Sequence, residues 1–262
     1  MRVRPLAAAG GALLLTTAVG AAPAAASSTG EASVTVVHGV ALPAAQVVDV
    51  WAGDTVLIDD LEYQDFQTIS VPGGTYDLYV TPADAEDTSG ALISATGVEV
   101  PAGADVSAVA NQVGGTPNLA TFVNEPVPDD AAGLTVRHTA DAPAVDVLAD
   151  GESLFMLEPG EGMSTEVPGG TYDVSVTAGG EPVPGLSVDG LTLEEGTGYY
   201  AYAVGDGDNG YALVLTTDEG TPSGVPAGGD GSAGTSVPVV PLLLVAAGAG
   251  VLAISARKFA TR

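Results

Sequence analysis

The sequence predicts an all-β protein: two tandem immunoglobulin-like or transthyretin-like β-sandwich domains, followed by a C-terminal transmembrane helix. Three observations lead to this prediction. The 262 residues include 36 glycines and 18 prolines, too many for long soluble helices but suited to short strands joined by tight turns. Apolar and polar residues alternate with a period of two in several segments. A motif also occurs twice, which indicates a duplicated domain.

The first element, residues 1–26, resembles a secretory signal sequence. Arg2 and Arg4 form its charged start, an apolar run covers 6–19, and Ala24-Ala25-Ala26 supplies small residues for cleavage. Because Val3 separates the two arginines, there is no twin-arginine pair, and we expect the general secretion route. An uncleaved N-terminal anchor is the alternative.

An internal repeat divides the central region into two copies. The residues Val71-Pro72-Gly73-Gly74-Thr75-Tyr76-Asp77 recur unchanged at 167–173. Further matches follow in the same order: 34–38 with 134–138, 48–50 with 145–147, and 98–103 with 191–196. These matches predict two domains, over 32–125 and 134–218, joined by a short acidic linker at 126–133.

Each copy reads as β-structure. Tyr76, Leu78 and Val80 alternate with polar neighbours, as expected for a strand buried on one face. The Pro-Gly-Gly before them supplies a turn. We expect further strands at 34–40, 46–52, 91–100, 104–111 and 118–124. Turn residues recur about every ten residues, which is typical of a sandwich.

The C-terminal region combines a stalk with a membrane anchor. Residues 219–236 hold almost no bulky side chain and predict a flexible stalk. Residues 237–256 carry no charge and, as a helix, would span about 30 Å, the thickness of a membrane core. The basic tail, 257–262, favours a cytoplasmic end. We therefore expect a single-pass cell-membrane protein with an extracellular N-terminal body.

Attachment to a cell wall is the alternative localisation, because a short apolar segment with a basic tail also ends sortase substrates. The stretch closest to a sortase pentapeptide, Val225-Pro226-Ala227-Gly228-Gly229, lacks the expected leucine and threonine.

The charge is strongly one-sided. Of the 33 acidic residues all lie between Glu31 and Asp230, and Arg137 is the only basic residue in that stretch, which leaves a net charge of −32. Such a surface excludes nucleic acid as a partner. We interpret the charge first as a general aid to the solubility of a cell-surface or salt-exposed protein, and cationic or cell-wall partners are the alternative. The absence of cysteine excludes disulfides, zinc-thiolate sites and thiol nucleophiles.

Few residues are candidates for a functional site. His38 and His138, the only histidines, hold equivalent positions, and each pairs in sequence with an aspartate, Asp49 or Asp146, as a candidate metal or proton-transfer site. The alternative, which we favour, is that each histidine lies at the rim of the core and holds the following loop. One histidine and one carboxylate per copy are too few ligands for a tight transition-metal site.

The stretch Asp206-Gly207-Asp208-Asn209-Gly210 offers two more candidate metal ligands, Asp206 and Asp208. Its spacing differs from that of an EF-hand loop, and a β-hairpin turn with Asn-Gly at its tip explains it better. Trp51 is expected in the core or at its rim, and Tyr199, Tyr200 and Tyr202 are expected to pack in the core rather than to form a binding platform. The sequence contains no Gly-x-Ser-x-Gly motif, and we expect no catalytic residues, cofactor or bound metal.

The segment Val136-Arg137-His138-Thr139-Ala140-Asp141-Ala142-Pro143-Ala144-Val145-Asp146-Val147 and the repeated Val-Pro-Gly-Gly-Thr-Tyr-Asp motif resemble the DUF4397 family of exported proteins. The first copy departs from the pattern, since 11 positions separate His38 from Asp49 against 8 from His138 to Asp146. The resemblance covers about 190 residues and implies two copies of an exported β-sandwich without an established activity.

These observations together predict a non-enzymatic cell-surface or envelope protein that presents two acidic β-sandwiches for structural or adhesive interaction. The alternative is a cation-dependent binding protein or an enzyme that uses the His/Asp pairs.

Overall fold

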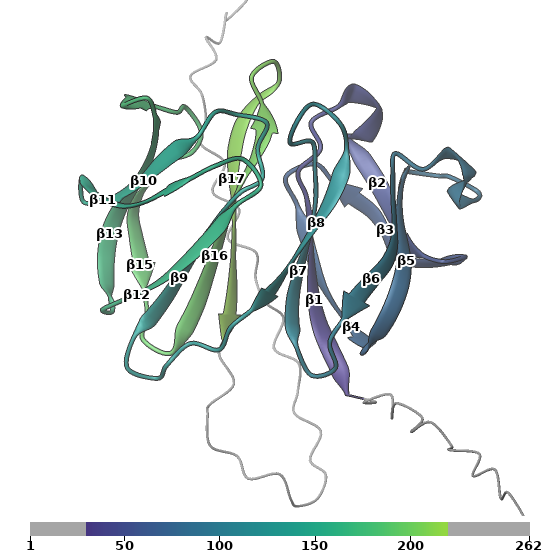
Figure 1. Cartoon of the computed structure of the whole chain (residues 1–262), viewed down its shortest axis with the longest axis horizontal. Coiled ribbons are helices and arrows are strands. Elements are labelled where there is room, and N and C mark those ends of the chain that lie inside the picture. The colour runs from purple at the N-terminus through teal and green to yellow at the C-terminus, as the bar shows by residue number, and fades with distance from the viewer. Residues whose placement is uncertain (1–29, 220–262) are drawn as a thin grey trace, which may run out of the picture.

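The computed structural model describes residues 30–219, which form strands and two short 3-10 turns, η1 (Pro43–Ala45) and η2 (Thr88–Gly90) (Figure 1). None of the elements in this range is a helix of the length and apolar character needed to cross a membrane. The predicted signal sequence, stalk after residue 219, transmembrane segment and basic tail lie outside the described residues.

The first half of the described chain forms a sandwich of two four-stranded sheets, with strand orders β4-β1-β7-β8 and β3-β2-β5-β6. Strands β1 and β7 run parallel, whereas the other neighbours are antiparallel. We call this unit the first sandwich. Its strands are β1 (Glu31–His38), β2 (Val47–Ala52), β3 (Thr55–Glu62), β4 (Phe66–Pro72), β5 (Gly74–Pro82), β6 (Ile93–Val100), β7 (Asp105–Asn111) and β8 (Asn118–Asn124).

The second half repeats this topology, with orders β12-β9-β16-β17 and β11-β10-β13, the latter extended by β14 and β15. Again one pair, β9 and β16, is parallel. Among the described residues, each sheet takes its strands from one half of the chain only. The strands of this second sandwich are β9 (Ala132–His138), β10 (Val145–Ala149), β11 (Glu152–Leu157), β12 (Gly162–Val167), β13 (Gly170–Ala178), β14 (Glu181–Pro182), β15 (Val188–Leu193), β16 (Thr197–Asp206) and β17 (Gly210–Glu219).

The all-β prediction is confirmed, and the expected strand at 118–124 has the observed bounds of β8. Strands β3 and β4 were not anticipated. In β3 the acidic pair Asp59-Asp60 interrupts the apolar pattern, and in β4 the large residues Phe66 and Ile69 fall out of a period of two. The periodicity of the sequence therefore does not predict a strand that is irregular or only partly buried.

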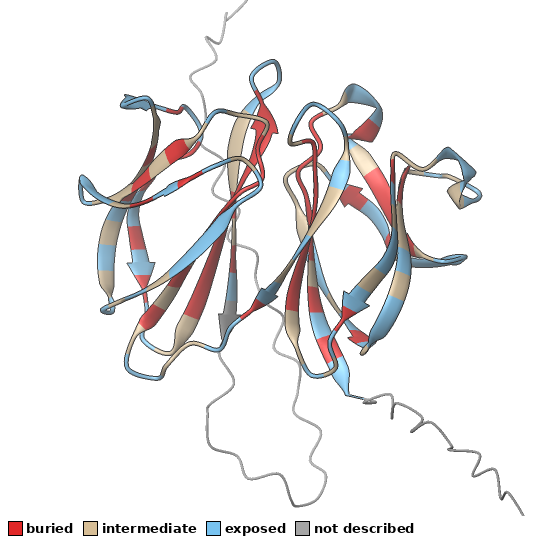
Figure 2. Ribbon diagram, viewed as in Figure 1, coloured by how far each residue is buried: buried red, intermediate tan, exposed pale blue. Residues whose placement is uncertain are grey.

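Each sandwich closes around its own core between its two sheets, as the alternating buried residues in Figure 2 show. The two sandwiches share an equivalent tyrosine hydrogen bond. The Tyr76 hydroxyl donates to the Pro72 carbonyl, and the Tyr172 hydroxyl donates to the Pro168 carbonyl. The first core encloses a cavity of about 30 Å³, partly lined by Val34.

A third apolar cluster lies between the sandwiches, which stand side by side in Figure 1 with β1 and β7 turned toward β16 and β17. Its buried members are Val37, Val109, Tyr200, Tyr202, Val204 and Val214. The two sandwiches therefore contact each other through the outer faces of equivalent sheets.

Candidate functional site

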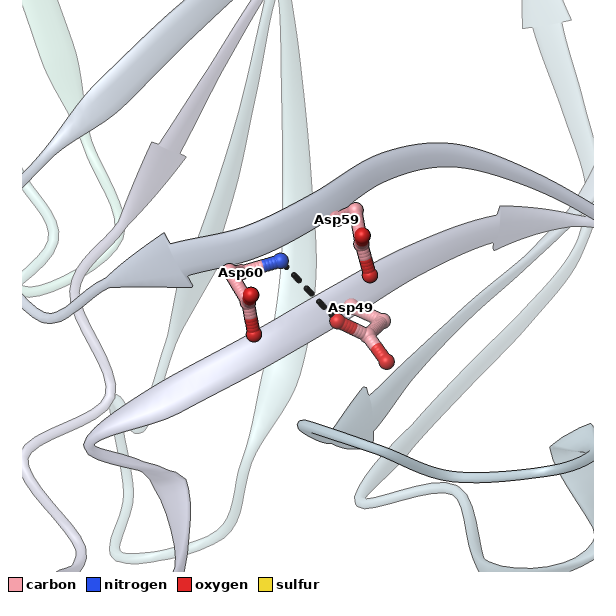
Figure 3. A group of neighbouring side chains, drawn as sticks. All are labelled: Asp49, Asp59 and Asp60. Atoms are coloured by element: carbon pink, nitrogen blue, oxygen red, sulfur yellow. Dashed lines mark hydrogen bonds between the residues drawn. The ribbon is translucent and has the colours of Figure 1, made fainter.

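Three aspartates of the first sandwich converge on one point between β2 and β3 (Figure 3). Carboxylate oxygens of Asp49, Asp59 and Asp60 lie within 4.8 Å of one another. A β-bulge brings them together: Val48 pairs with Leu61 and Val50 with Ile58, so two residues of β3 face Asp49 alone.

The bulge also sets the electrostatics of this acidic cluster. Asp49 is buried, and its Oδ1 accepts the backbone N–H of Asp60 at 3.0 Å, while Asp59 and Asp60 are exposed. The negative charges of Asp60, Asp49 and Asp84 raise the pKa of Asp59. Clustered carboxylate oxygens are the ligands that calcium and magnesium prefer, so this is where a hard cation could be held. Sequence reasoning identified Asp49 but missed Asp59 and Asp60, because the bulge is not visible in the periodicity.

The second sandwich has no counterpart of this cluster. Between Phe155 and Leu157, which pair with Val147 and Val145, only Met156 intervenes, and it faces Asp146. The Oδ1 atom of Asp146 instead accepts the Ser153 hydroxyl. The two sandwiches are therefore chemically different at this position, although their topology is the same.

The structure does not bring the histidines together with the predicted aspartate partners. His38 continues the inward face of Val34 and Val36, whereas Asp49 lies between two core valines of β2 and so points away from the core. The hydrogen bonds of both histidines run to the following loop. His38 Nε2 lies 2.6 Å from the Ala45 carbonyl, and His138 Nε2 lies 2.9 Å from that of Pro143.

Burial also lowers the pKa of both histidines, and the loop carbonyls only partly oppose this effect. A carbonyl partner requires Nε2 to carry the proton, which leaves Nδ1 as the acceptor. In His38 this atom accepts the Val40 backbone N–H at 3.4 Å. The geometry is that of neutral histidines that hold loops.

The stretch from Asp206 to Gly210 is a hairpin turn between β16 and β17, as predicted. Burial alone would raise the pKa of Asp206, but hydrogen bonds from Asn209, Asp208 and Gln112 outweigh burial and lower it. Both oxygens of Asp206 accept these bonds, so its carboxylate closes the turn and links it to the first sandwich.

The four aromatic residues considered from the sequence, Trp51, Tyr199, Tyr200 and Tyr202, are all buried. Trp51 donates from Nε1 to the Thr81 hydroxyl at 2.9 Å. Tyr199 packs in the second core, whereas Tyr200 and Tyr202 face the first sandwich. The adjacent residues Tyr199 and Tyr200 therefore pack on opposite faces of β16. Tyr200 and Tyr202 belong to the contact between the sandwiches.

Arg137 also has a structural role that sequence reasoning missed. Only 3% of it is exposed, and its guanidinium lies over the rings of Phe122, Tyr202 and Tyr200 at 4.4, 5.4 and 5.5 Å. It also donates to the Tyr202 hydroxyl and to Asn124 Oδ1. Burial lowers the pKa of Arg137. The available signal was that arginine occupies the position of Val37 in the first copy.

A polar cleft of about 680 Å³ opens beside Arg137 at the seam between the sandwiches. Its walls include the linker residues 126–128 and the hydroxyl-bearing Thr135 and Ser164. Glu125 and Glu166 also line it. With the guanidinium of Arg137 these two carboxylates leave the lining one net negative charge, which favours a cationic occupant over an anionic one.

Comparison with known proteins identifies a family but no activity. No curated protein matches the sequence. The family model described as "Domain of unknown function (DUF4397)" matches residues 15–148. In the structure this match spans the first sandwich together with β9 and most of β10 of the second. The match extends over more than half of the sequence, and the chain therefore belongs to the DUF4397 family.

Proposed function

We propose that the chain is a non-enzymatic cell-surface protein whose two acidic β-sandwiches, as tandem family copies, make structural or adhesive contacts with cationic partners. One observation carries the proposal: Arg137, the only basic residue among residues 30–219, is buried. The same range has 32 acidic residues, so its net charge is −31 and the charged side chains that reach solvent are carboxylates. A field of one sign attracts cationic surfaces and repels polyanions.

Sequence features at both ends support a place in the cell envelope. A signal sequence at 1–26 would export the body, and the uncharged segment 237–256 with its basic tail would retain it in the cell membrane. Wall attachment remains the alternative. Fractionation of cells that express the full chain tests this part, with a chain that ends at residue 236 as the control. Recovery of the intact full chain mainly from the medium would contradict membrane retention.

The partner class is tested by binding to immobilised polylysine, with polyglutamate as the control surface. We expect binding to polylysine that weakens steeply with salt, because screening shortens the range of the field. The variant E125Q/E166Q removes the cleft carboxylates, and E152Q/E181Q removes two exposed carboxylates elsewhere. A field spread over the whole surface predicts small and equal losses for both variants. Salt-independent binding, or equal binding to polyglutamate, would refute the proposal.

A second candidate function is cation-dependent binding, favoured by the convergence of Asp49, Asp59 and Asp60. Calcium is added at matched ionic strength while unfolding is monitored, since a ligand of the native state raises its stability. The variant D59N/D60N is compared with E152Q/E181Q. A calcium effect that only D59N/D60N removes would support this function. The same response to calcium in both variants would show that calcium acts only by general screening of the surface charge.

An enzyme that uses the His/Asp pairs is the weaker alternative. The hydrogen bonds of His38 and His138 to loop carbonyls occupy the Nε2 atoms that a proton-transfer role would need.

A further inference from the structure

The facing surfaces of the two sandwiches differ at three equivalent positions. Equivalent positions can be read from the parallel strand pairs, β1 with β7 and β9 with β16. His38 pairs with Ala110 in the first sandwich, and His138 pairs with Ala203 in the second. In this register, the small side chains Val37, Ser107 and Val109 of the first sandwich correspond to the large side chains Arg137, Tyr200 and Tyr202 of the second. One face is therefore built from small side chains and the other from large ones.

The two faces fit each other in size. Tyr202, fully buried, reaches across to Ser107, and the two hydroxyls share a hydrogen bond of 2.7 Å. A tyrosine at position 107 would occupy the space of the Tyr202 ring. The Gly39 backbone also lies close to a side chain of the second sandwich, since a Cβ added at Gly39 would lie 2.7 Å from Val204 Cγ1. Such close packing requires the small residues on the first face.

The same comparison of side-chain sizes disfavours pairing of either face with the same face of a second copy. In a pair of second sandwiches, Tyr202 of one would meet Tyr200 of the other, because Tyr200 holds the place of Ser107. In a pair of first sandwiches, Val109 would meet Ser107 and leave a gap. Overpacking and cavities both destabilise a contact.

Polar contacts add to the match. Arg137 reaches from the second sandwich to Phe122 and Asn124 of the first. At the hairpin end, Gln112 donates to Asp206 across the seam. These contacts hold together two units that repel each other: residues 30–125 contain 14 acidic residues and no basic one, and residues 132–219 contain 16 acidic residues and Arg137.

We propose that the outer faces of sheets β4-β1-β7-β8 and β12-β9-β16-β17 are a matched pair of binding surfaces. Each takes the other as its partner through the complementarity of small and large side chains, and neither takes a second copy of itself. This contact, rather than the linker, holds the two sandwiches as one body.

The test distinguishes the contribution of the contact from that of the linker, and it uses the full-length chain. A site for a specific protease is inserted between the exposed residues Asp129 and Asp130, and the folded chain is cut in detergent solution. The second half is then captured by a C-terminal tag, and the retained first half is measured. We expect the halves to stay together after cleavage. Their separation in the unmodified background would overturn the proposal.

The variant S107Y should weaken retention of the first half at least tenfold, a change that corresponds to about 1.4 kcal/mol. The sandwich should tolerate this residue, because Tyr200 occupies the equivalent position in the second sandwich. Adding Y202V to S107Y should restore retention by removing the opposing ring. The control S94Y makes the same exchange at an exposed position of β6.

Circular dichroism of the uncut chain verifies that each variant is folded. If S107Y fails to fold, Y202S, which removes the large partner, replaces it and should also weaken retention. Equal retention for the folded interface variant and S94Y would overturn the role of size complementarity. Capture of second halves by one another would overturn the exclusion of self-pairing.

Discussion

The cavity in the first core yields a quantitative prediction for V34L. Val34 lines a cavity of about 30 Å³, and the second sandwich has fully buried Leu134 at the equivalent position. Filling a cavity of this size removes a cost of about 0.7 kcal/mol at about 24 cal/mol per Å³. The buried methylene group contributes about 0.8 kcal/mol by transfer from water. These figures overlap, so we expect V34L to raise the free energy of unfolding by about 1 kcal/mol.

Urea unfolding, followed by circular dichroism, measures this change. The reciprocal variant L134V is the matched control, and it should lower the free energy of unfolding by about 1 kcal/mol because it removes a methylene group from a fully buried side chain. A decrease in stability for V34L would refute the reasoning, since it would mean that the first core is already fully packed and is strained by the larger side chain.

Three further predictions concern charge, pH and close packing. The melting temperature of residues 27–236 should rise with sodium chloride, because screening weakens the repulsion among carboxylates; a flat or falling melting temperature would contradict this. Burial lowers the pKa of His38 and His138 below the usual 6.5, so the unfolded chain binds protons that the folded chain does not. Stability from the neutral histidines is thus complete above pH 6.5 and decreases as the pH falls below it. The variant H38Q/H138Q should lose this component of the pH dependence of urea unfolding, whereas an unchanged slope would show that the carboxylates alone set it. The variant G39A should lower the free energy of unfolding by about 1–3 kcal/mol, because its Cβ would press on Val204 across the seam and on the Ala110 carbonyl oxygen; G90A, at a position with open space and without positive φ, tests whether loss of glycine alone has this effect.

Much of the architecture could be predicted from the sequence, because it depends on neighbouring residues. Alternation in Tyr76, Leu78 and Val80 records which face of one strand is buried, and the Pro-Gly-Gly turn before it depends on local backbone sterics. The repeated Val-Pro-Gly-Gly-Thr-Tyr-Asp motif predicts two similar domains, and this prediction needs no information about tertiary contacts. The net charge likewise follows from composition alone, and with it the class of partner that we propose.

The contacts that give each site its character depend on tertiary structure. The bulge that places Asp59 and Asp60 beside Asp49 arises from how β2 and β3 pair, which no single strand encodes. The pleat then separates Asp49 from His38, although both were plausible partners in the sequence.

The contact between the sandwiches was the feature least accessible from sequence. Ser107 and Tyr202 share a hydrogen bond across 95 positions, and each is unremarkable in its own strand. In the sequence Arg137 is only the one positive charge of an acidic body, yet the fold places its guanidinium over three aromatic rings. Local patterns determine which face of a strand is apolar. Which distant face covers it is decided by the fit of side chains from strands far apart in the sequence, and that fit exists only in the tertiary structure.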